Sequence, residues 1–324
     1  MLGAPEERFK IYKIQPFDVN QAKAFLKKKG ASEVIPDWAP TRPLFLNYLI
    51  GRNLLDQLVE ARHVGSFPEG SAWTSLLNMI AERESDQSEG VDKQAILDFL
   101  AALSSKARHG KGVDRSFSPS EIDGVFYSVT GNTISDEERR LLLRLPGLGI
   151  ASDNSSNRSF VDQDFMNVCG AMSLFKFIGN PYSESEFVQD IRQVSEQLNQ
   201  SGISALCSML DKERVQRGVI KAALDREVSY GQGMGGALAY DIFLSLLQIS
   251  PEIKGKFHFD GIDIRLIDLC QEFDVELNLT FSNCIIETIL MPAASSDVPN
   301  FLFHDCLVIP TSGETDLRRG FPNA

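Results

Sequence analysis

Two cysteines and a histidine near the C-terminus carry side chains that can bind zinc. Cys284 lies in LTFSNCII (279–286), Cys306 lies in FLFHDCLV (301–308), and His304 precedes the second cysteine by two residues. A zinc site needs four converging nitrogen, sulfur or oxygen ligands, usually at closer spacing than the 22 residues that separate these cysteines. The alternative is that both stretches belong to a repeat in which the thiols pack inside.

A third stretch with the same pattern favours the repeat. FHFDGIDI (257–264) is again displaced by 22 residues and carries Ile262 at the cysteine position. A position that accepts isoleucine is apolar, and free cysteine packs as a small hydrophobic residue. A fixed period with alternating apolar residues is typical of solenoids, in which each coil buries one face against the next. We predict no metal site here, and an array cut short, because the next matching Phe would fall at residue 325.

One glycine motif could bind a nucleotide cofactor. Gly231-x-Gly233-x-x-Gly236, followed by a helix and Asp260, contains the parts of a dinucleotide fingerprint. The preceding KAALDREVSY is charged and predicts a helix instead of a buried strand, so we favour a helix–helix turn. The alternative, a nucleotide-cofactor-binding enzyme using the Gly231–Gly236 loop, predicts a parallel sheet around 225–260 and tight retention of NAD or FAD.

Other catalytic motifs are missing from the sequence. It contains no G-x-x-x-x-G-K-[ST] phosphate loop, no G-x-S-x-G elbow, no H-E-x-x-H pair and no kinase signature. The four histidines are isolated from one another along the chain. We therefore predict no catalytic residue, and a chain that is not an enzyme by itself.

Composition limits the classes of partner. The chain has 324 residues, 43% of them hydrophobic, a net charge of −12 and a pI near 4.9, which argue against a large nucleic-acid surface. It has no signal-peptide pattern at MLGAPEERFK and no apolar run of about 18–20 residues for a membrane helix. Five scattered cysteines, an odd number, fit a reducing compartment. We expect a cytoplasmic protein with neither a membrane nor a nucleic-acid partner.

Capping patterns predict where several helices begin. In a capping box an Asp or Ser side chain and a Gln or Glu three residues later satisfy each other's backbone N–H groups. The pairs are Asp18–Gln21, Ser118–Glu121, Ser135–Glu138 and Ser183–Glu186. Apolar periodicity predicts further helices at 71–83, 92–106 and between 187 and 250, and alternation predicts a strand at Phe9–Ile14.

These elements predict an α+β fold that is mainly helical. Helix, helix, polar hairpin, strand (RSFVD, 158–162) and helix follow one another in the order of a winged-helix-like domain. We predict four domains: a strand with helices (1–110), the winged-helix-like domain (111–180), a helical linker domain (181–253) and a β-helix-like or pentapeptide-like solenoid (254–324). DNA binding by the second domain is disfavoured by the acidic charge.

Two segments resemble STAND-type P-loop NTPases of the NACHT and AP-ATPase kind. KIYKIQPFDVNQAKAFLKKKG…IPDWAPTRPLFLNYLIGRNLL is similar to the junction between the last core strand and the helical lid. Thr41-Arg42-Pro43-Leu44 stands where Gly-Leu-Pro-Leu is commoner. ERRLLLRLPGLGIASDNSSNRSFVDQDFMNVCGAMSLFKF is similar to the winged-helix region that follows. The resemblance covers about residues 9–180.

The resemblance implies a nucleotide-dependent signalling switch with a C-terminal sensor, of a kind that includes bacterial anti-phage defence proteins. Pro43 would pack on the nucleotide base, and Arg42 would lie near phosphate or an acidic neighbour; the alternative is an N1 proline and a solvated arginine. ATP or ADP with Mg²⁺ would be held by a core that is absent from this sequence, so this chain alone is expected to bind no cofactor. Its partners would be that core or another protein, with self-association on activation. The lone strand Phe9–Ile14 needs a sheet to join, which also indicates the remainder of a longer NTPase.

Overall fold

The computed structural model describes residues 17–31, 41, 43–51, 55, 67–87, 90–110, 115–151, 156–180, 191–250, 253–268, 277–290 and 300–309. The chain forms two compact units, Met1–His63 and Val64–Ala324. The predicted strand Phe9–Ile14 and the capping box at Ser183 lie outside the described residues. The division into four domains stays a prediction.

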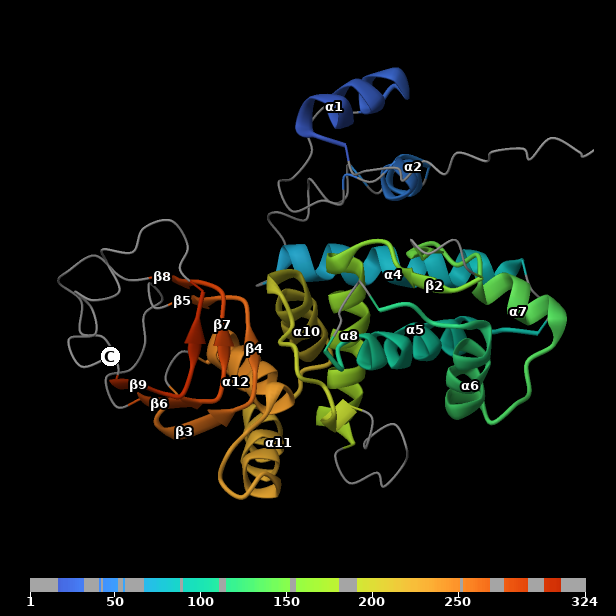
Figure 1. The fold of residues 1–324 in the computed structure, drawn as a ribbon. Coiled ribbons are helices and arrows are strands. Elements are labelled where there is room, and N and C mark those ends of the chain that lie inside the picture. The colour runs from blue at the N-terminus through green and yellow to red at the C-terminus, as the bar shows by residue number, and fades with distance from the viewer. Residues whose placement is uncertain are drawn as a thin grey trace, which may run out of the picture. The chain divides into compact units, whose positions relative to one another are not determined.

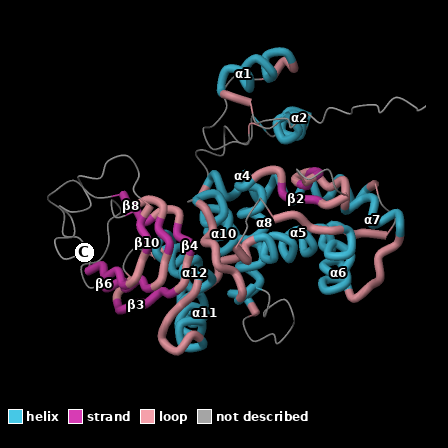
Figure 2. Tube along the Cα trace, in the orientation of Figure 1, coloured by secondary structure: helices cyan, strands magenta, loops and turns pink. Residues whose placement is uncertain are grey.

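The fold mixes helices with small sheets, as predicted, and helices predominate (Figures 1 and 2). The helices are α1 (Val19–Lys28), α2 (Pro43–Gly51), α4 (Pro68–Asp86), α5 (Lys93–Ala107), α6 (Pro119–Thr130), α7 (Asp136–Leu142), α8 (Gln163–Gly179), α10 (Gln200–Lys212), α11 (Arg217–Tyr230) and α12 (Ala237–Ile249). Among the described residues, no helix combines the length and apolar character needed to cross a membrane.

The strands are short, and most of them lie after α12. They are β1 (Leu148–Ile150), β2 (Arg158–Phe160), β3 (Gly255–Asp260), β4 (Asp263–Ile264), β5 (Ile267–Asp268), β6 (Leu277–Ser282), β7 (Ile285–Ile286), β8 (Ile289–Leu290), β9 (Asn300–His304) and β10 (Leu307–Val308). β1 and β2 form an antiparallel hairpin, and Phe117 adds a bridge to Arg158 on β2. All of the pairing among β3–β10 is parallel.

Small residues allow the helices of the second unit to pack closely. α10 packs against α4 and α8, and α8 packs against α5. Gly70 on α4 donates its backbone N–H to Ser204 Oγ at 3.0 Å, and a Cβ at Gly70 would lie 1.9 Å from the Ser204 carbonyl oxygen. Ser104 on α5 donates its hydroxyl to the Met166 carbonyl on α8 at 2.6 Å. The core of this unit therefore depends on short contacts that larger side chains would block.

The predicted 22-residue period is confirmed as parallel pairing in register. We call residues 255–268, 277–290 and 300–309 repeats 1, 2 and 3. Phe259 pairs with Phe281, and Phe281 pairs with Phe303, each 22 positions on. The sheets run in the order β3-β6-β9 and β4-β7-β10, with β5 beside β8. Figure 1 shows equivalent strands of the repeats side by side.

Each repeat turns its first corner at a residue in the left-handed backbone conformation. Gly261, Asn283 and Asp305 occupy equivalent positions and have φ values of 65°, 54° and 54°. Glycine adopts this conformation freely, and Asn and Asp tolerate it better than other side chains. Asn283 also donates its side-chain N–H to Asp260 Oδ1 at 2.8 Å, which links the corner of repeat 2 to repeat 1.

Phenylalanine rings form a column inside the repeats. The ring centroids of Phe259 and Phe281 are 5.8 Å apart, and those of Phe281 and Phe303 are 5.5 Å apart. Tyr240 on α12 meets Phe259 edge-on at 5.0 Å, so the column continues into the helical part. Such aromatic contacts add roughly 0.5–1.5 kcal/mol each beyond the area that they bury.

The upstream edge of repeat 1 is covered by segments from the helical part. Gly235 donates its N–H to the His258 carbonyl at 2.7 Å and accepts the Asp260 N–H at 2.9 Å. On the neighbouring strand, Asp263 donates its N–H to the Ser195 carbonyl at 3.1 Å. An open strand edge invites unwanted pairing, and here both leading edges are closed by the same chain.

Candidate functional site

Pro43, predicted to contact a nucleotide base, is the first residue of α2 and is half-buried. Its partner in that prediction, Arg42, lies outside the described residues. Two residues before Pro43, the Thr41 carbonyl accepts the Phe17 N–H at 3.1 Å. Because Phe17 immediately precedes the cap of α1, this bond brings the beginnings of α1 and α2 together.

The beginning of α1 is already capped by its own residues. Asp18 Oδ1 accepts the Gln21 N–H at 2.8 Å, and Gln21 Oε1 accepts the Asp18 N–H at 3.1 Å, which confirms the predicted box. The Asp18 carboxylate therefore meets the positive end of this helix dipole. Neither helix has an acidic residue in its first turn.

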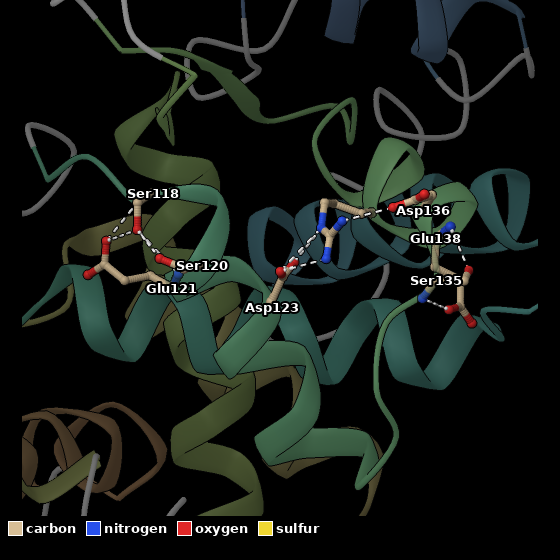
Figure 3. Close-up of polar contacts among 8 residues, drawn as sticks. Ser118, Ser120, Glu121, Asp123, Ser135, Asp136 and Glu138 are labelled. Carbon is tan, nitrogen blue, oxygen red and sulfur yellow. Dashed lines mark hydrogen bonds and ion pairs between the residues drawn. The ribbon is translucent and has the colours of Figure 1, made fainter.

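Of the three capping boxes predicted in the second unit, the two that lie in the described residues both form (Figure 3). Ser118 and Glu121 cap α6, and Ser135 and Glu138 cap α7. Although partial burial opposes it, hydrogen bonds from Ser118 and the Arg115 charge lower the pKa of Glu121. These boxes fix the residues at which both helices begin.

An ion pair between α6 and α7 restrains the angle at which the two helices meet. Arg139 on α7 donates from Nε and Nη2 to the two carboxylate oxygens of Asp123 on α6, at 2.9 and 2.8 Å. A two-pronged contact of this kind sets geometry better than a single ammonium would. Hydrogen bonds from Arg139 to Asp123, with the Asp123 charge, raise the pKa of the guanidinium.

The Gly231–Gly236 loop is a turn between α11 and α12, as favoured above. Four consecutive N–H groups, those of residues 231–234, donate to carbonyls of residues 227, 229, 228 and 231. The next N–H, of Gly235, is bound to His258. A dinucleotide fingerprint uses such N–H groups for phosphate and follows a strand, whereas here α11 precedes the loop. The enzyme alternative predicts a parallel sheet around 225–260. Residues 225–230 and 237–249 are helical instead.

The cysteines and His304 stack within the repeats. Cys284 is buried at the position that Ile262 occupies in repeat 1, and its thiol faces the Ser282 carbonyl at 3.2 Å. Burial raises the pKa of Cys284 to about 11. Cys306 is half-buried, with its sulfur 3.4 Å from the carbonyl oxygen of His304. Within the described ranges no group of three or more His, Cys, Asp or Glu residues is arranged to hold a metal ion.

Two carboxylates with perturbed pKa values lie at the beginning of α10. Glu69 Oε1 accepts the Ser201 hydroxyl at 3.0 Å, and Asp164 Oδ1 accepts from Asn199 Nδ2 at 2.6 Å. Burial raises the pKa of both, and Asp162 raises that of Asp164 further. Raised carboxylate pKa values occur at catalytic sites, but both groups here hold the helix start in place.

A buried ion pair joins the end of α5 to α12, and it was not predicted. Arg108, just after α5, bonds through Nη2 to Asp241 Oδ2 on α12 and to the Glu196 carbonyl at 2.6 Å. Asp241 Oδ1 accepts the Leu198 N–H at 2.8 Å. Burial raises the pKa of Asp241, against the opposing effect of Arg108. The 195–198 segment thus held is the one that pairs with repeat 1.

One sequence signal could have indicated this pair. Asp241 interrupts the otherwise apolar run ALAYDIFL, and a charged residue on such a helix needs a buried partner. Its partner, 133 positions away, could not be chosen from the sequence.

No protein-family model, curated protein or solved structure matches this chain. Function is therefore inferred from the motifs and the geometry.

Proposed function

We propose that this chain is the regulatory and sensing part of a nucleotide-dependent signalling switch of the STAND type, acting in the cytoplasm and not catalytic by itself. ATP or ADP with Mg²⁺ would be bound by a P-loop core that this sequence does not contain. The chain would change its arrangement when the nucleotide is exchanged or hydrolysed, and its partners would be that core and a protein effector. Anti-phage signalling is the biological role that the family resemblance favours.

The order of elements supports a winged-helix-like domain as the middle part of the switch. After α5 come the bridge residue Phe117, then α6, α7, β1 and β2. Phe117 pairs with β2, and β2 pairs with β1, which gives a small antiparallel sheet with β2 at its centre. Two capped helices followed by a hairpin on this sheet are the arrangement expected of a winged helix.

The parallel repeats support a solenoid as the sensing part. Equivalent residues pair at a constant displacement, and the Phe column runs through all three repeats. A stack of this kind presents a regular outer surface that can bind an extended partner. Exposed apolar residues on the described repeats include Leu302 and Leu307, which are 55% and 62% exposed.

The observation that carries the proposal is the continuous connection between the two parts. Arg108 links the end of α5 to α12 and to the 195–198 segment, and that segment pairs with Asp263 in repeat 1. Arg265 in repeat 1 adds an ion pair to Glu196 at 3.7 Å. A rigid, buried connection allows an event at the repeats to bias the helical part, as a switch requires.

The nucleotide role of Arg42 and Pro43 is tested in an intact relative that carries the P-loop core. Alanine at the positions equivalent to Arg42 or Pro43 is expected to weaken ADP binding, because a charge near phosphate or a surface against the base is lost. Alanine at the position of Asn47, which is exposed on the same helix, is the matched control. Unchanged ADP affinity in the first two variants would remove the site from the proposal.

The chain itself provides a second test. Calorimetric titration of the purified chain with ATP, ADP, NAD and FAD is expected to show no saturable binding, because the phosphate loop is supplied elsewhere. Tight retention of NAD or FAD would instead support the enzyme alternative at the Gly231–Gly236 loop. Binding of ATP without the core would contradict the assignment of nucleotide binding to a separate P-loop domain.

A further inference from the structure

A cavity of about 260 Å³ lies where α10 and α12 meet the repeats. Aromatic rings form much of its wall, with Tyr240 and Phe243 from α12 and Phe281 from β6. Leu247 and Ile267 add aliphatic surface. The volume is below the roughly 300–1,000 Å³ of sites for drug-sized molecules, so it suits a molecule of one or two rings.

A buried side chain at this cavity has a hydrogen-bonding group without a partner. Gln197 lines the cavity and is 6% exposed, and its Oε1 makes no hydrogen bond to any described residue. Its backbone is held in place, since the Gln197 N–H donates to the Asp263 carbonyl at 3.4 Å. Nearly all buried polar groups are hydrogen-bonded, so an unpaired one beside a cavity points to a missing donor. The planar amide can also turn over and present either its oxygen or its nitrogen.

The charges around the cavity favour an uncharged ligand. Burial raises the pKa of Tyr240, which keeps its hydroxyl neutral at physiological pH. Arg265 at the lining is balanced by Glu196, with 3.7 Å between Nη2 and Oε2. A ligand with a net charge would lose hydration without gaining an unpaired partner of opposite charge.

We infer that this cavity is a binding site for a small, uncharged, planar aromatic molecule that carries one N–H or O–H donor. The ring lies against the Tyr240, Phe243 and Phe281 rings, where offset and edge-to-face contacts are favourable. The donor is accepted by Gln197 Oε1. This inference does not rest on the nucleotide switch, and either can fail without the other.

Indole and indene test the inference directly, because the two have nearly the same shape and only indole has an N–H. The full chain, labelled at its leucine and isoleucine methyl groups, is titrated with each compound and followed by NMR. Indole is expected to bind roughly 2- to 10-fold more tightly than indene, the effect of one net hydrogen bond. The methyl signals of Leu247, Ile267 and Leu279, which line the cavity, are expected to shift.

Two glutamine variants separate the acceptor from the cavity. Gln197→Met is expected to abolish the preference for indole while indene still binds, since the apolar wall is intact. Gln200→Met is the matched control, because Gln200 also lines the cavity but is exposed, and the preference should persist. Leu247→Trp fills the space and should prevent binding of both compounds; Leu244→Trp serves if that variant does not fold.

Several results would overturn the inference. They are the absence of saturable binding by indole, equal affinity for indole and indene in the unchanged protein, or methyl shifts confined to residues outside the cavity. The first would leave Gln197 satisfied by water alone. If N-acetyltryptophanamide bound more tightly than indole, the site would belong to a protein side chain and the small-molecule assignment would be wrong.

Discussion

Arg108 and Asp241 form an ion pair whose side chains are 1% and 0% exposed, and this pair joins α5 to α12 across 133 positions of sequence. Two further Arg108 nitrogens, Nε and Nη1, make no hydrogen bond to described residues. A buried pair is not strongly stabilising in itself, because desolvation offsets the attraction. What it does impose is a penalty on any arrangement in which one partner remains buried alone.

Removing one partner is therefore expected to be far worse than removing both. Arg108→Met should lower the free energy of unfolding by about 3–5 kcal/mol, because Asp241 stays buried without its partner. Arg108→Met combined with Asp241→Leu should recover a large part of that loss. Urea unfolding measures both. Arg144→Met is the control, since Arg144 is exposed and its loss should matter by about 0.5 kcal/mol or less. Equal effects of Arg108→Met and Arg144→Met would contradict the prediction.

Two glycine-to-alanine changes on helices should have opposite effects. At Gly70 a new Cβ would meet the Ser204 backbone, so α4 and α10 must separate, at a cost of about 1–3 kcal/mol or more. At Gly124 in α6 a Cβ meets nothing within 4 Å, and alanine should stabilise the helix by up to about 1 kcal/mol. Thermal unfolding of both variants checks the signs. A Gly70→Ala protein as stable as the unchanged chain would mean that the close approach is absent.

Asn283 should discriminate sharply among replacements. Its φ of 54° suits glycine, so Asn283→Gly should lose little beyond the hydrogen bond to Asp260. Asn283→Val should cost about 1–2 kcal/mol more than Asn283→Gly, because a β-branched side chain is strained in this conformation. Thr280→Val, in the adjoining strand, is the control for the added valine. Urea midpoints rank the three variants, and a valine variant equal to the glycine variant would argue against the left-handed corner.

The Ser118–Glu121 capping box should make stability depend on pH in the acidic range. The pKa of Glu121 is lower in the folded state than the usual 4.5, so its ionised form stabilises the fold above that value. This contribution is lost as pH falls through the folded-state pKa. At pH 6–7 the unchanged protein should thus have a higher free energy of unfolding than Glu121→Gln, and this difference should vanish at lower pH. Glu137 is exposed and lies outside both boxes, so Glu137→Gln is the control. The difference in urea midpoint between the unchanged protein and this variant should not change with pH in the same way.

Thiol reactivity should follow burial in the repeats. At pH 8 iodoacetamide should modify half-buried Cys306 first, whereas Cys284 should stay protected because burial raises its pKa to about 11. Cys207, with a pKa raised by burial to about 12, should react only on unfolding. Mass spectrometry of a Cys270→Ser variant follows these three sites together with Cys169, which is buried and should also stay protected. Rapid modification of Cys284 would mean that repeats 2 and 3 separate in solution.

Local signals explain which elements could be predicted from the sequence. The boxes at Asp18, Ser118 and Ser135 depend on residues three positions apart, and all three form. The same pattern recurs every 22 residues in repeats 1, 2 and 3, so the register of the strands could also be predicted. These are interactions that the sequence carries at fixed short spacing.

Long-range packing explains what local signals could not specify. α10, with the sequence QSGISALCSMLDK, is rich in Ser and Gly, which weakens its helical signal. Those small residues are there because neighbours come close: a Cβ at Gly202 would lie 3.0 Å from the Asn167 carbonyl oxygen. Pro43 does begin a helix, and its nucleotide role stays a prediction. Gln197 and Arg108 could not be singled out from the sequence, because the residues around them are far away along the chain.

The closed leading edge of repeat 1 also gives the stack a direction of assembly. Strand β3 can pair with Gly235 only once the turn before α12 has formed, and β6 then needs β3 as its template. The turn, β3 and β6 follow one another along the chain, so a ribosome synthesises them in the same order in which they would pair. We therefore expect each new strand to emerge beside one that has already paired, which would shorten the time that an unpaired β-edge is open to aggregation.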